Sequence, residues 1–305
     1  MVIKNRLKLC LVISATIMLT ALVMTILGYG INFGIDFAGG LSIEYNMNAT
    51  FQQSDVETAL RNQGVTDYKV TTSGADATIL NIRIPKLDTD EEIQVLQAGL
   101  ETELLQMYPA MDTENAAASY VGPTAGATLI KNAILSVVIA SALMLIYIAI
   151  RFSFYSGMAA VVGLLHDVFI MISFMVILRN VIQMNSSFIA AMLTIVGYSI
   201  NNTIVIFDRI RENNAKPAYH SIKRDEIVNI SISESLGRTI NTTLTTLVTI
   251  VSLYVLGVSS IREFSLPIIV GIVSGLYSAN MINGYVWAFL EEHVAARKKT
   301  VKKRS

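Results

Sequence analysis

The chain has 305 residues, of which 53% are hydrophobic and only 15% are charged, and its mean hydropathy is +0.54. A soluble domain usually has about 25% charged residues, so this composition excludes an ordinary cytosolic enzyme and a disordered chain. Basic and acidic residues number 23 each, which excludes a protein that binds nucleic acid through bulk positive charge. The single cysteine, Cys10, excludes a disulfide framework and a cysteine-based zinc site.

The neutral total charge hides two oppositely charged parts of the chain. Residues 31–129 contain four basic and fourteen acidic residues, which gives them a net charge of −10. The rest of the chain has a net charge of +10. The sequence therefore predicts a polar, acidic domain inserted into an apolar, basic chain.

Six apolar stretches are long enough to cross a bilayer, which takes roughly 20 residues of helix. They run approximately over residues 9–28, 130–150, 157–178, 186–207, 241–257 and 264–290. The first stretch is longer than the hydrophobic region of a typical signal peptide, and no A-x-A cleavage pattern follows it. We therefore expect six retained spans, with a short interfacial helix over 219–236 between the fourth and the fifth.

Lysine and arginine in the short loops predict the orientation, because these residues favour the cytoplasmic side. With the N-terminus inside, sixteen basic residues lie on the inner side, whereas the outer short loops contain Arg179 and Arg262. We expect both termini in the cytoplasm. The predicted domains are 1–30 (N-terminal tip and first span), 31–129 (outside), 130–290 (five further spans with a cytoplasmic segment over 208–240) and 291–305, a basic tail. This tail either anchors the orientation or contacts a ribosome or acidic lipid.

Residues 31–129 have the pattern of a small α+β domain. We predict strands over 41–47, 68–72, 78–84 and 114–121, and helices over 53–62 and 89–107. Ser54 and Glu57 have the spacing of a capping box at the start of the first helix. The order βαββαβ is that of the ferredoxin-like, split βαβ arrangement. This segment has no histidine or cysteine, so we expect a structural or docking domain.

Two groups of residues inside the spans are candidates for a function, because ionisable residues in a membrane helix are often functional and small residues often mark helix contacts. His166 and Asp167 lie about ten residues into the third span, roughly 15 Å deep. They belong either to an ion path or to a structural pair that joins helices. In the sixth span Gly271, Gly275 and Ala279 follow at intervals of four residues and favour close helix packing, within the chain or against a partner.

Several motifs occur in a fixed order along the chain. The segment Gly34-Ile-Asp36-Phe-Ala-Gly39-Gly40 follows the first span, and VGPTAG ends at residue 126. The fourth span contains Gly197-Tyr198-Ser-Ile-Asn201-Asn202-Thr and ends with Asp208-Arg209-Ile-Arg-Glu-Asn; the motif RTINTTLTT then begins at Arg238. From about residue 34 to 291, these motifs resemble the SecF proteins of the SecD/SecF protein-export family, which is related to the RND transporters.

This resemblance implies a multi-pass protein of the bacterial cytoplasmic membrane with six spans and one ferredoxin-like external domain. It implies half of a SecD–SecF unit that uses the proton-motive force to promote translocation of secreted polypeptides. The implied partners are SecD, the SecYEG translocon, YajC, an unfolded client polypeptide and membrane lipid, without nucleic acid, metal or cofactor. No G-x-S-x-G, H-E-x-x-H or Walker A motif occurs, so we expect no enzymatic activity.

One position departs from the family pattern, GYSxNDT, whose aspartate is considered a proton relay. Here that position is Asn202, and an amide has no titratable proton. Three explanations stay open. Asp167 or a carboxylate of SecD carries the protons, the carbonyls of Asn201 and Asn202 help to coordinate sodium, or Asn202 is a divergent or engineered substitution that weakens coupling.

Arg238 matches the family arginine that works with this aspartate. We expect its guanidinium to reach Asp208, Asp167 or an acid of a partner, or to extend to the membrane interface. Asp208 and Arg209 belong either to a simple interfacial stop with weak surface pairs or to a gate at the inner mouth of an ion path. The rival functions are a self-sufficient RND-type exporter of lipids or small molecules and an uncoupled scaffold subunit.

Overall fold

A computed structural model of the chain describes residues 4–73, 77–85 and 90–302. The chain divides into two compact units. The helical unit comprises Met1–Asn32, Leu135–Gln183 and Ser187–Ser305, and the mixed unit comprises Phe33–Ile134 and Met184–Ser186. Residues 303–305 of the expected basic tail lie outside the described residues.

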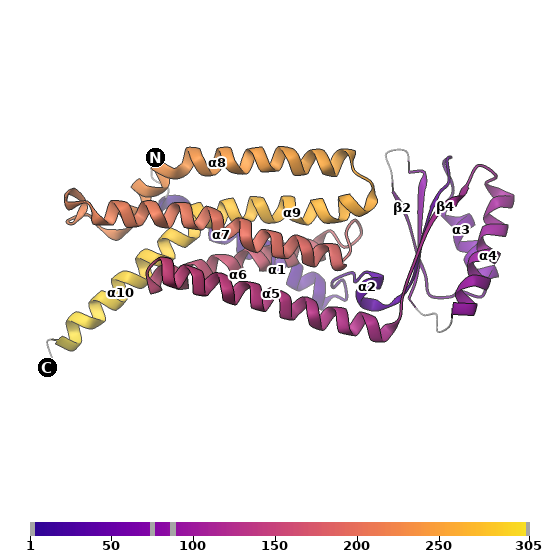
Figure 1. The fold of residues 1–305 in the computed structure, drawn as a ribbon, viewed down its shortest axis with the longest axis horizontal. Coiled ribbons are helices and arrows are strands. Elements are labelled where there is room, and N and C mark those ends of the chain that lie inside the picture. Colours follow the sequence, from indigo (N-terminus) through magenta and orange to yellow (C-terminus); the bar gives the residue numbers. More distant parts are fainter. Residues whose placement is uncertain (1–3, 74–76, 86–89, 303–305) are drawn as a thin grey trace. The chain divides into compact units, whose positions relative to one another are not determined.

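Six helical segments are long and apolar enough to cross a membrane, which confirms the predicted number of spans. These segments are Leu7–Ile26, Ala125–Arg151, Phe154–Ile177, Ser186–Ala215, Arg224–Leu256 and Ile261–His293. The corresponding helices are α1 (Lys4–Ile26), α5 (Pro123–Arg151), α6 (Phe154–Ile177), α7 (Ser186–Ala215), α8 (Arg224–Leu256), α9 (Ser259–Ser278) and α10 (Gly284–Lys302). In Figure 1, α8 and α9 lie side by side and are joined by a short turn.

The helix α8 corrects one prediction, because it begins at Arg224 and continues without a break to Leu256. Only the short 3-10 turn η1 (Pro217–Tyr219) precedes it, so the separate interfacial helix over 219–236 is wrong. The polar composition of this stretch suggested a boundary near residue 236. However, Ile227, Val228 and Ile232 are fully buried in the helical core, and this apolar face keeps the first turns of α8 folded onto the bundle.

The sixth span is not one continuous α-helix. A π-helical turn, η2 (Ala279–Asn283), separates α9 from α10. Such turns are rare, they add a residue to the helical repeat, and they occur frequently at functional sites. This turn changes which residues of the sixth span share a face, so the simple interval of four residues no longer holds beyond Ser278.

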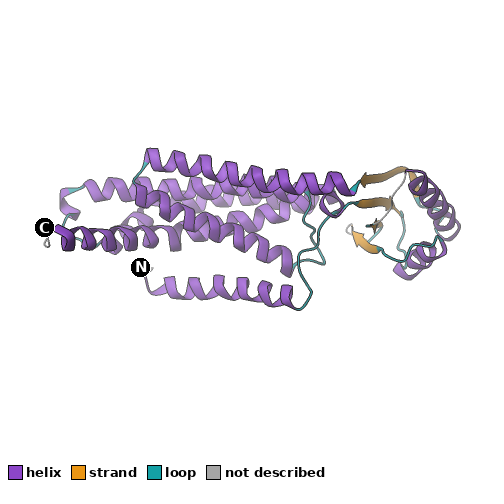
Figure 2. Ribbon diagram, turned by 90° about the horizontal axis from the view of Figure 1, so that it is seen from below, coloured by secondary structure: helices purple, strands orange, loops and turns teal. Residues whose placement is uncertain are grey.

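The mixed unit is a four-stranded antiparallel sheet with two helices on one face (Figures 1 and 2). The strand order is β2-β3-β1-β4, and the chain order is βαββαβ, as in the split βαβ arrangement that the sequence predicted. The elements are β1 (Gly40–Asn46), α3 (Gln53–Asn62), β2 (Lys69–Ser73), β3 (Ile79–Ile84), α4 (Asp90–Met107) and β4 (Asp112–Val121).

The core of this unit forms where alternate residues of β1 and β3 face the two helices. Ile43, Tyr45 and Leu80 are fully buried there, together with Leu60 of α3 and Leu100 of α4. The expected capping box is wrong, because α3 begins one residue earlier than Ser54 and its N-cap is Gln52. The hydroxyl of Ser54, inside the first turn, instead contacts the carboxylate of Asp55.

The glycine-rich motif adopts a conformation that needs glycine. Gly39 and Gly40 have φ values of 76° and 111°, in the region that residues with a side chain rarely adopt. A Cβ atom on Gly40 would also overlap the carbonyl oxygen of Ile84 on the paired strand β3. The two glycines therefore allow the chain to turn from the short helix α2 (Ile35–Ala38) directly into the sheet.

The preceding part of this motif binds the segment before α7. The backbone nitrogen of Gly34 donates to the carbonyl oxygen of Met184 at 2.8 Å, and Phe33 forms a parallel bridge with Met184. The Oδ2 atom of Asp36 accepts from the backbone nitrogen of Ser186, the first residue of α7, at 2.7 Å. The first N–H groups of a helix have no partner inside it, so Asp36 caps α7 from a distant position in the sequence.

We predict that Asp36→Ala will loosen the first turn of α7, because the loss of an N-cap side chain costs about 0.5–2 kcal/mol. Hydrogen exchange measured by mass spectrometry should show faster exchange of the amides in the peptide that contains Ser186 and Phe188. Asp67→Ala, which removes an exposed carboxylate of the same unit, is the control and should leave this peptide unchanged. Equal exchange in Asp36→Ala and the wild type would contradict the capping role.

Candidate functional site

The helical unit contains a completely buried carboxylate. Asp167 of α6 has an exposed fraction of 0%. Its Oδ2 atom accepts hydrogen bonds from the hydroxyls of Ser199 at 2.5 Å and Ser278 at 2.8 Å, and its Oδ1 atom accepts one from Ser274 at 2.7 Å. Burying an unpartnered carboxylate would be very costly, so these three donors replace the water that the ionised group loses.

Close packing of α7 and α9 brings the three serines together. Ser274 and Ser278 are four residues apart and share one face of α9, whereas Ser199 comes from α7. A Cβ on Gly271 would overlap the side chain of Ile195, and one on Gly275 would lie 3.1 Å from the Cα of Ser199. Gly271 and Gly275 therefore face α7 of this same chain, and the absence of their side chains lets the serines reach Asp167.

The π-helical turn η2 places a second polar layer next to this cluster. It begins at the buried Ala279 and ends at Asn283, whose Nδ2 donates to the hydroxyl of Thr203 at 2.8 Å. The same hydroxyl donates to the carbonyl oxygen of Ser199 at 3.0 Å. A Cβ on Gly163 would overlap the amide of Asn283, so this layer also depends on a glycine of α6, one turn before Asp167.

His166 connects the buried carboxylate to the first span. Its Nδ1 atom lies 3.0 Å from Oδ1 of Asp167, and its Nε2 atom lies 2.8 Å from the hydroxyl of Ser14 on α1. Ser14 also lies 3.2 Å from the hydroxyl of Tyr277 on α9, and the rings of His166 and Tyr277 stack with centroids 5.7 Å apart. Polar groups from four helices therefore form one connected network around His166 and Asp167.

Sequence reasoning identified His166 and Asp167 but missed most of their partners. Ser14, Ser274, Tyr277 and Ser278 were not among the candidates. The spacing of Ser274 and Ser278 by four residues was a readable signal, since serines rarely serve a purpose on the lipid face of a span. Ser14 gave no such signal, because one serine in an apolar run is ordinary.

The structure separates the two asparagines of the fourth span. Asn202 has an exposed fraction of 1%, and its Nδ2 atom has no hydrogen-bond partner among the described residues. Asn201 is exposed on another side of α7. Their carbonyls therefore do not converge on one ion within this chain. The hydroxyl of Tyr198 is also buried without a partner in the described part of the chain. A Cβ on Gly197 would make an ordinary van der Waals contact with Met144 at 3.9 Å.

Arg238 reaches neither of the two acids of this chain that were considered for it. Its side chain is exposed on α8. Asp208 instead binds Arg211 at 2.7 Å and lies 3.8 Å from Arg151, and Asp167 is enclosed by the serines. The expected pairing of Arg238 with Asp208 or Asp167 is therefore wrong, and an acid of a partner or the membrane interface stays as its predicted contact.

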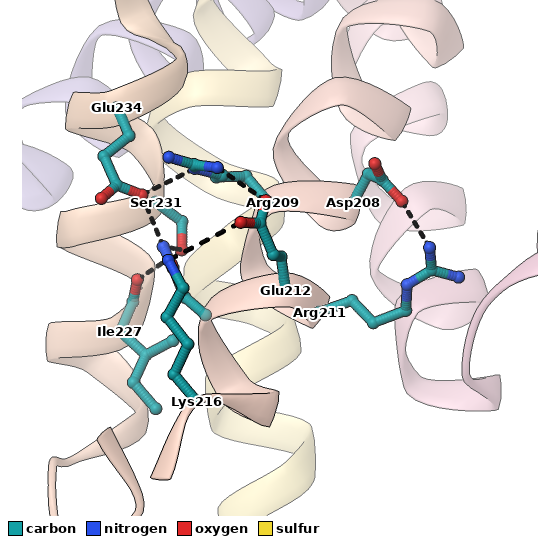
Figure 3. A network of polar contacts seen from close by, with 9 residues as sticks. Asp208, Arg209, Arg211, Glu212, Lys216, Ile227, Ser231 and Glu234 are labelled. Atoms are coloured by element: carbon teal, nitrogen blue, oxygen red, sulfur yellow. Dashed lines mark hydrogen bonds and ion pairs between the residues drawn. The ribbon is translucent and has the colours of Figure 1, made fainter. Parts of the chain in front are cut away.

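The end of α7 is joined to the start of α8 by a second polar cluster (Figure 3). Arg209 donates to Glu212 at 2.6 Å and to Glu234 at 2.7 Å. Asn213, which is fully buried, donates to Ser231 at 3.0 Å and to Glu234 at 2.7 Å, and its Oδ1 accepts from Lys216 at 2.8 Å. The ion pairs are partly exposed and contribute little stability, so the buried amide is the main link between the two helices.

Comparisons with known proteins agree on the family. The family profile described as "Protein export membrane protein SecD/SecF, C-terminal" matches residues 100–293. The profile of the "SecD/SecF GG Motif" matches residues 25–49, which contain Asp36 and the glycines Gly39 and Gly40. The two matches cover the glycine-rich motif and all of the helices that carry the polar network, except α1.

Individual relatives of this chain are also named SecF or SecDF. The protein translocase subunit SecF of Rickettsia bellii is 36% identical over 255 residues, which cover 84% of this chain and 82% of the relative. SecF of Thermodesulfovibrio yellowstonii is also 36% identical, over 81% of this chain and 80% of the relative. The protein translocase subunit SecDF of Bacillus subtilis is 36% identical over 87% of this chain but only 35% of the relative.

The fold also matches a solved structure. The crystal structure of SecDF from Thermus thermophilus, described as a translocon-associated membrane protein, aligns with a TM-score of 0.80 and 30% sequence identity. The alignment covers 94% of this chain and 38% of that protein. This chain therefore spans a little over a third of the length of the SecDF proteins, and most of the length of the SecF proteins.

We predict that Asn213→Ala will destabilise the helical unit, because it removes the two hydrogen bonds that the buried amide donates to α8, one of them to the carboxylate of Glu234, at a cost of about 1–3 kcal/mol. Thermal unfolding in detergent should show a lower midpoint than the wild type. Glu212→Ala is the control, since its side chain is 55% exposed and its ion pairs are worth little. A larger loss of stability in Glu212→Ala than in Asn213→Ala would contradict this assignment.

Proposed function

Since the chain belongs to the SecD/SecF family of protein-export membrane proteins, we propose that it acts as the SecF-type subunit of a Sec protein translocase. In this role it pairs with SecD and uses the proton gradient to promote translocation of secreted polypeptides across the bacterial cytoplasmic membrane. Both termini face the cytoplasm, and residues 31–129 face the opposite side. The proposal requires no cofactor and no catalytic residue.

The buried carboxylate of Asp167 supports this proposal most directly. An ionisable group within a membrane span is costly and is therefore a candidate for ion transfer. Asp167 contacts both α7 and α9, so gain or loss of its charge alters the hydrogen bonds that hold two other spans. Of the three explanations for Asn202, proton transfer by Asp167 fits best, because the carbonyls of Asn201 and Asn202 lie on different sides of α7.

A polar face on α8 supports pairing with SecD. Arg238 is followed on the exposed side of this helix by Asn241, Thr242, Thr245, Thr249 and Ser252. A charged guanidinium and an amide are costly against lipid, so this face calls for a protein neighbour with an acidic group. SecD is the proposed neighbour, because the SecDF relatives extend well beyond the part that this chain matches. SecYEG, YajC and the client polypeptide follow as proposed partners from the same family role.

The two rival functions make different predictions for the same preparations. A self-sufficient RND-type exporter would transport lipids or small molecules without SecD. An uncoupled scaffold would support translocation equally well with and without a proton gradient, and Asn202 in place of the family aspartate keeps this rival in consideration. Export measured with and without SecD and with and without an uncoupler separates all three.

We predict that Asp167→Asn will abolish the stimulation of export by a proton gradient, because the amide cannot take up or release a proton. The measurement is translocation of a secretory protein into inverted membrane vesicles that contain this chain, SecD and the translocon, with and without an uncoupler. Ser173→Ala removes another buried hydroxyl of α6 that does not contact Asp167, and this control should keep the stimulation. Full stimulation in Asp167→Asn would remove Asp167 from the mechanism.

We also predict that Asn202→Asp will increase the proton dependence of export, since it adds a buried carboxyl group on the fourth span to that of Asp167 on the third. The measurement is the ratio of export rates before and after addition of an uncoupler, in the same vesicles. Asn201→Asp adds the same charge on the exposed side of α7 and serves as the matched control. An unchanged ratio in Asn202→Asp would show that this position takes no part in coupling.

A further inference from the structure

We propose that Ser14, on the first membrane-spanning helix, relays protons between Tyr277 and the pair formed by His166 and Asp167. This inference rests on the proposed function, since it adds one branch to the proton path that ends at Asp167. It gives α1 a part in proton transfer, whereas the sequence predicted only that this span is retained.

The geometry provides a continuous line of exchangeable hydrogens. The hydroxyl of Ser14 lies between Nε2 of His166 at 2.8 Å and the hydroxyl of Tyr277 at 3.2 Å. On the far side of the imidazole, Nδ1 lies 3.0 Å from the carboxylate of Asp167. Ser14 is 5% exposed and Asp167 is 0% exposed, so bulk water is largely excluded from both residues. The transfer therefore has to pass through the protein groups themselves.

Counting hydrogens shows why Ser14 must be able to reverse its direction. The carboxylate of Asp167 can only accept, so Nδ1 of His166 carries a hydrogen and donates to it. In the structure the hydroxyl of Ser14 donates to the hydroxyl of Tyr277. When the imidazole is neutral, Nε2 has no hydrogen and must accept from Ser14, so both hydroxyls turn and Tyr277 donates to Ser14. When the imidazole is charged, Nε2 donates to Ser14, and the hydroxyl of Ser14 donates to Tyr277.

The two arrangements differ by one proton and are connected by simple transfers. A proton that arrives at the Tyr277 oxygen displaces the tyrosine hydrogen to Ser14, and the original hydrogen of Ser14 moves to Nε2. Tyr277 and Ser14 end with the number of hydrogens that they had at the start, and His166 gains the positive charge. The charged imidazole then pairs with the carboxylate of Asp167 and can pass a proton to it from Nδ1.

Among the described residues, few other titratable groups face His166. From the helices packed around it, Asp167 of α6 and Tyr277 of α9 face the imidazole, and the thiol of Cys10 on α1 lies beside the tyrosine hydroxyl. Tyr277 stacks on His166 with an angle of 28° between the rings, and its hydroxyl lies 3.2 Å from that of Ser14. Tyr277 is the last group of this relay on the side away from Asp167, although its neighbour in sequence, Ser278, donates to Asp167 directly.

The test measures proton flux driven by a pH gradient in vesicles that contain the full chain with its partner subunit. Ser14→Ala removes the hydroxyl that carries the transfer, and we expect proton flux to fall at least about tenfold, as for loss of a positioned proton-transfer group. Ser14→Thr keeps a hydroxyl and should retain most of the flux. Thr16→Val is the matched control, because it removes an exposed hydroxyl of α1 that bonds only to its own helix.

A second variant protects the test against misfolding of Ser14→Ala. Tyr277→Phe interrupts the same line from the other end and keeps the stacked ring, so it should reduce flux to a similar extent. Wild-type flux in either Ser14→Ala or Tyr277→Phe overturns the relay. Loss of flux in Ser14→Thr and Thr16→Val as well also overturns it, because the effect would then come from packing of α1.

The relay and the proposed function fail in different ways. If Asp167→Asn abolishes proton flux while Ser14→Ala leaves it unchanged, the ion path stands and this branch of it is refuted. If Asp167→Asn itself leaves flux unchanged, the proposed function fails, and the relay fails with it. The relay is supported when Asp167→Asn and Ser14→Ala both lose flux and Thr16→Val keeps it.

Discussion

A carboxylate in the middle of a membrane bundle needs donors, and the arrangement of the helical unit follows from that need. Asp167 obtains three hydroxyl donors, one from α7 and two from α9. Without them the charged group would be without hydrogen bonds in a medium that cannot solvate it. The spans around Asp167 are thus held together by a polar interaction whose strength depends on the charge of one side chain.

This constraint explains where the small residues lie. Hydroxyl side chains are short, so the backbones of α6, α7 and α9 must come close before a serine can reach Asp167. Gly163, Gly271 and Gly275 allow that approach, and each faces a polar or packing contact of this network. The π-helical turn η2 has a related effect, because its wider repeat returns Asn283 to the side of the bundle that faces α6 and α7. The three glycines and the π-helical turn therefore let the polar side chains of neighbouring helices reach one another.

A path for protons needs different side chains from a binding site for a metal ion. A relay needs a chain of groups that both donate and accept, and hydroxyls and imidazole have this property. The network around His166 consists of such groups. Asn202, in contrast, offers only an amide, and its Nδ2 atom lacks a partner within the described residues. Arg238 and the polar face of α8 are exposed in this chain, and they are the surface that we propose for SecD.

The sequence by itself determined the architecture and one half of the candidate site. Apolar runs of about 20 residues predict membrane spans, because a helix of that length crosses the bilayer and pairs its own backbone polar groups. Alternation and turn residues likewise determined the order of strands and helices along the chain in the mixed unit, and an acid next to a histidine at membrane depth identified Asp167 and His166. The sequence predicted the starts of helices less well. Helix α8 begins earlier than expected, inside a polar stretch, because the buried face of the helix decides the boundary and the average composition does not.

Only the tertiary structure decided which side chains meet. Ser14 and Tyr277 are 263 residues apart in the sequence, and Asp36 caps a helix that begins 150 residues later. Contacts of this kind depend on the distance and rotation between helices, which a one-dimensional pattern does not contain. The π-helical turn is a further example. It changes which residues of the sixth span share a face, and no residue type in the sequence predicts it. Short-range periodicity therefore gives the elements, and packing alone selects the partners of a buried charge.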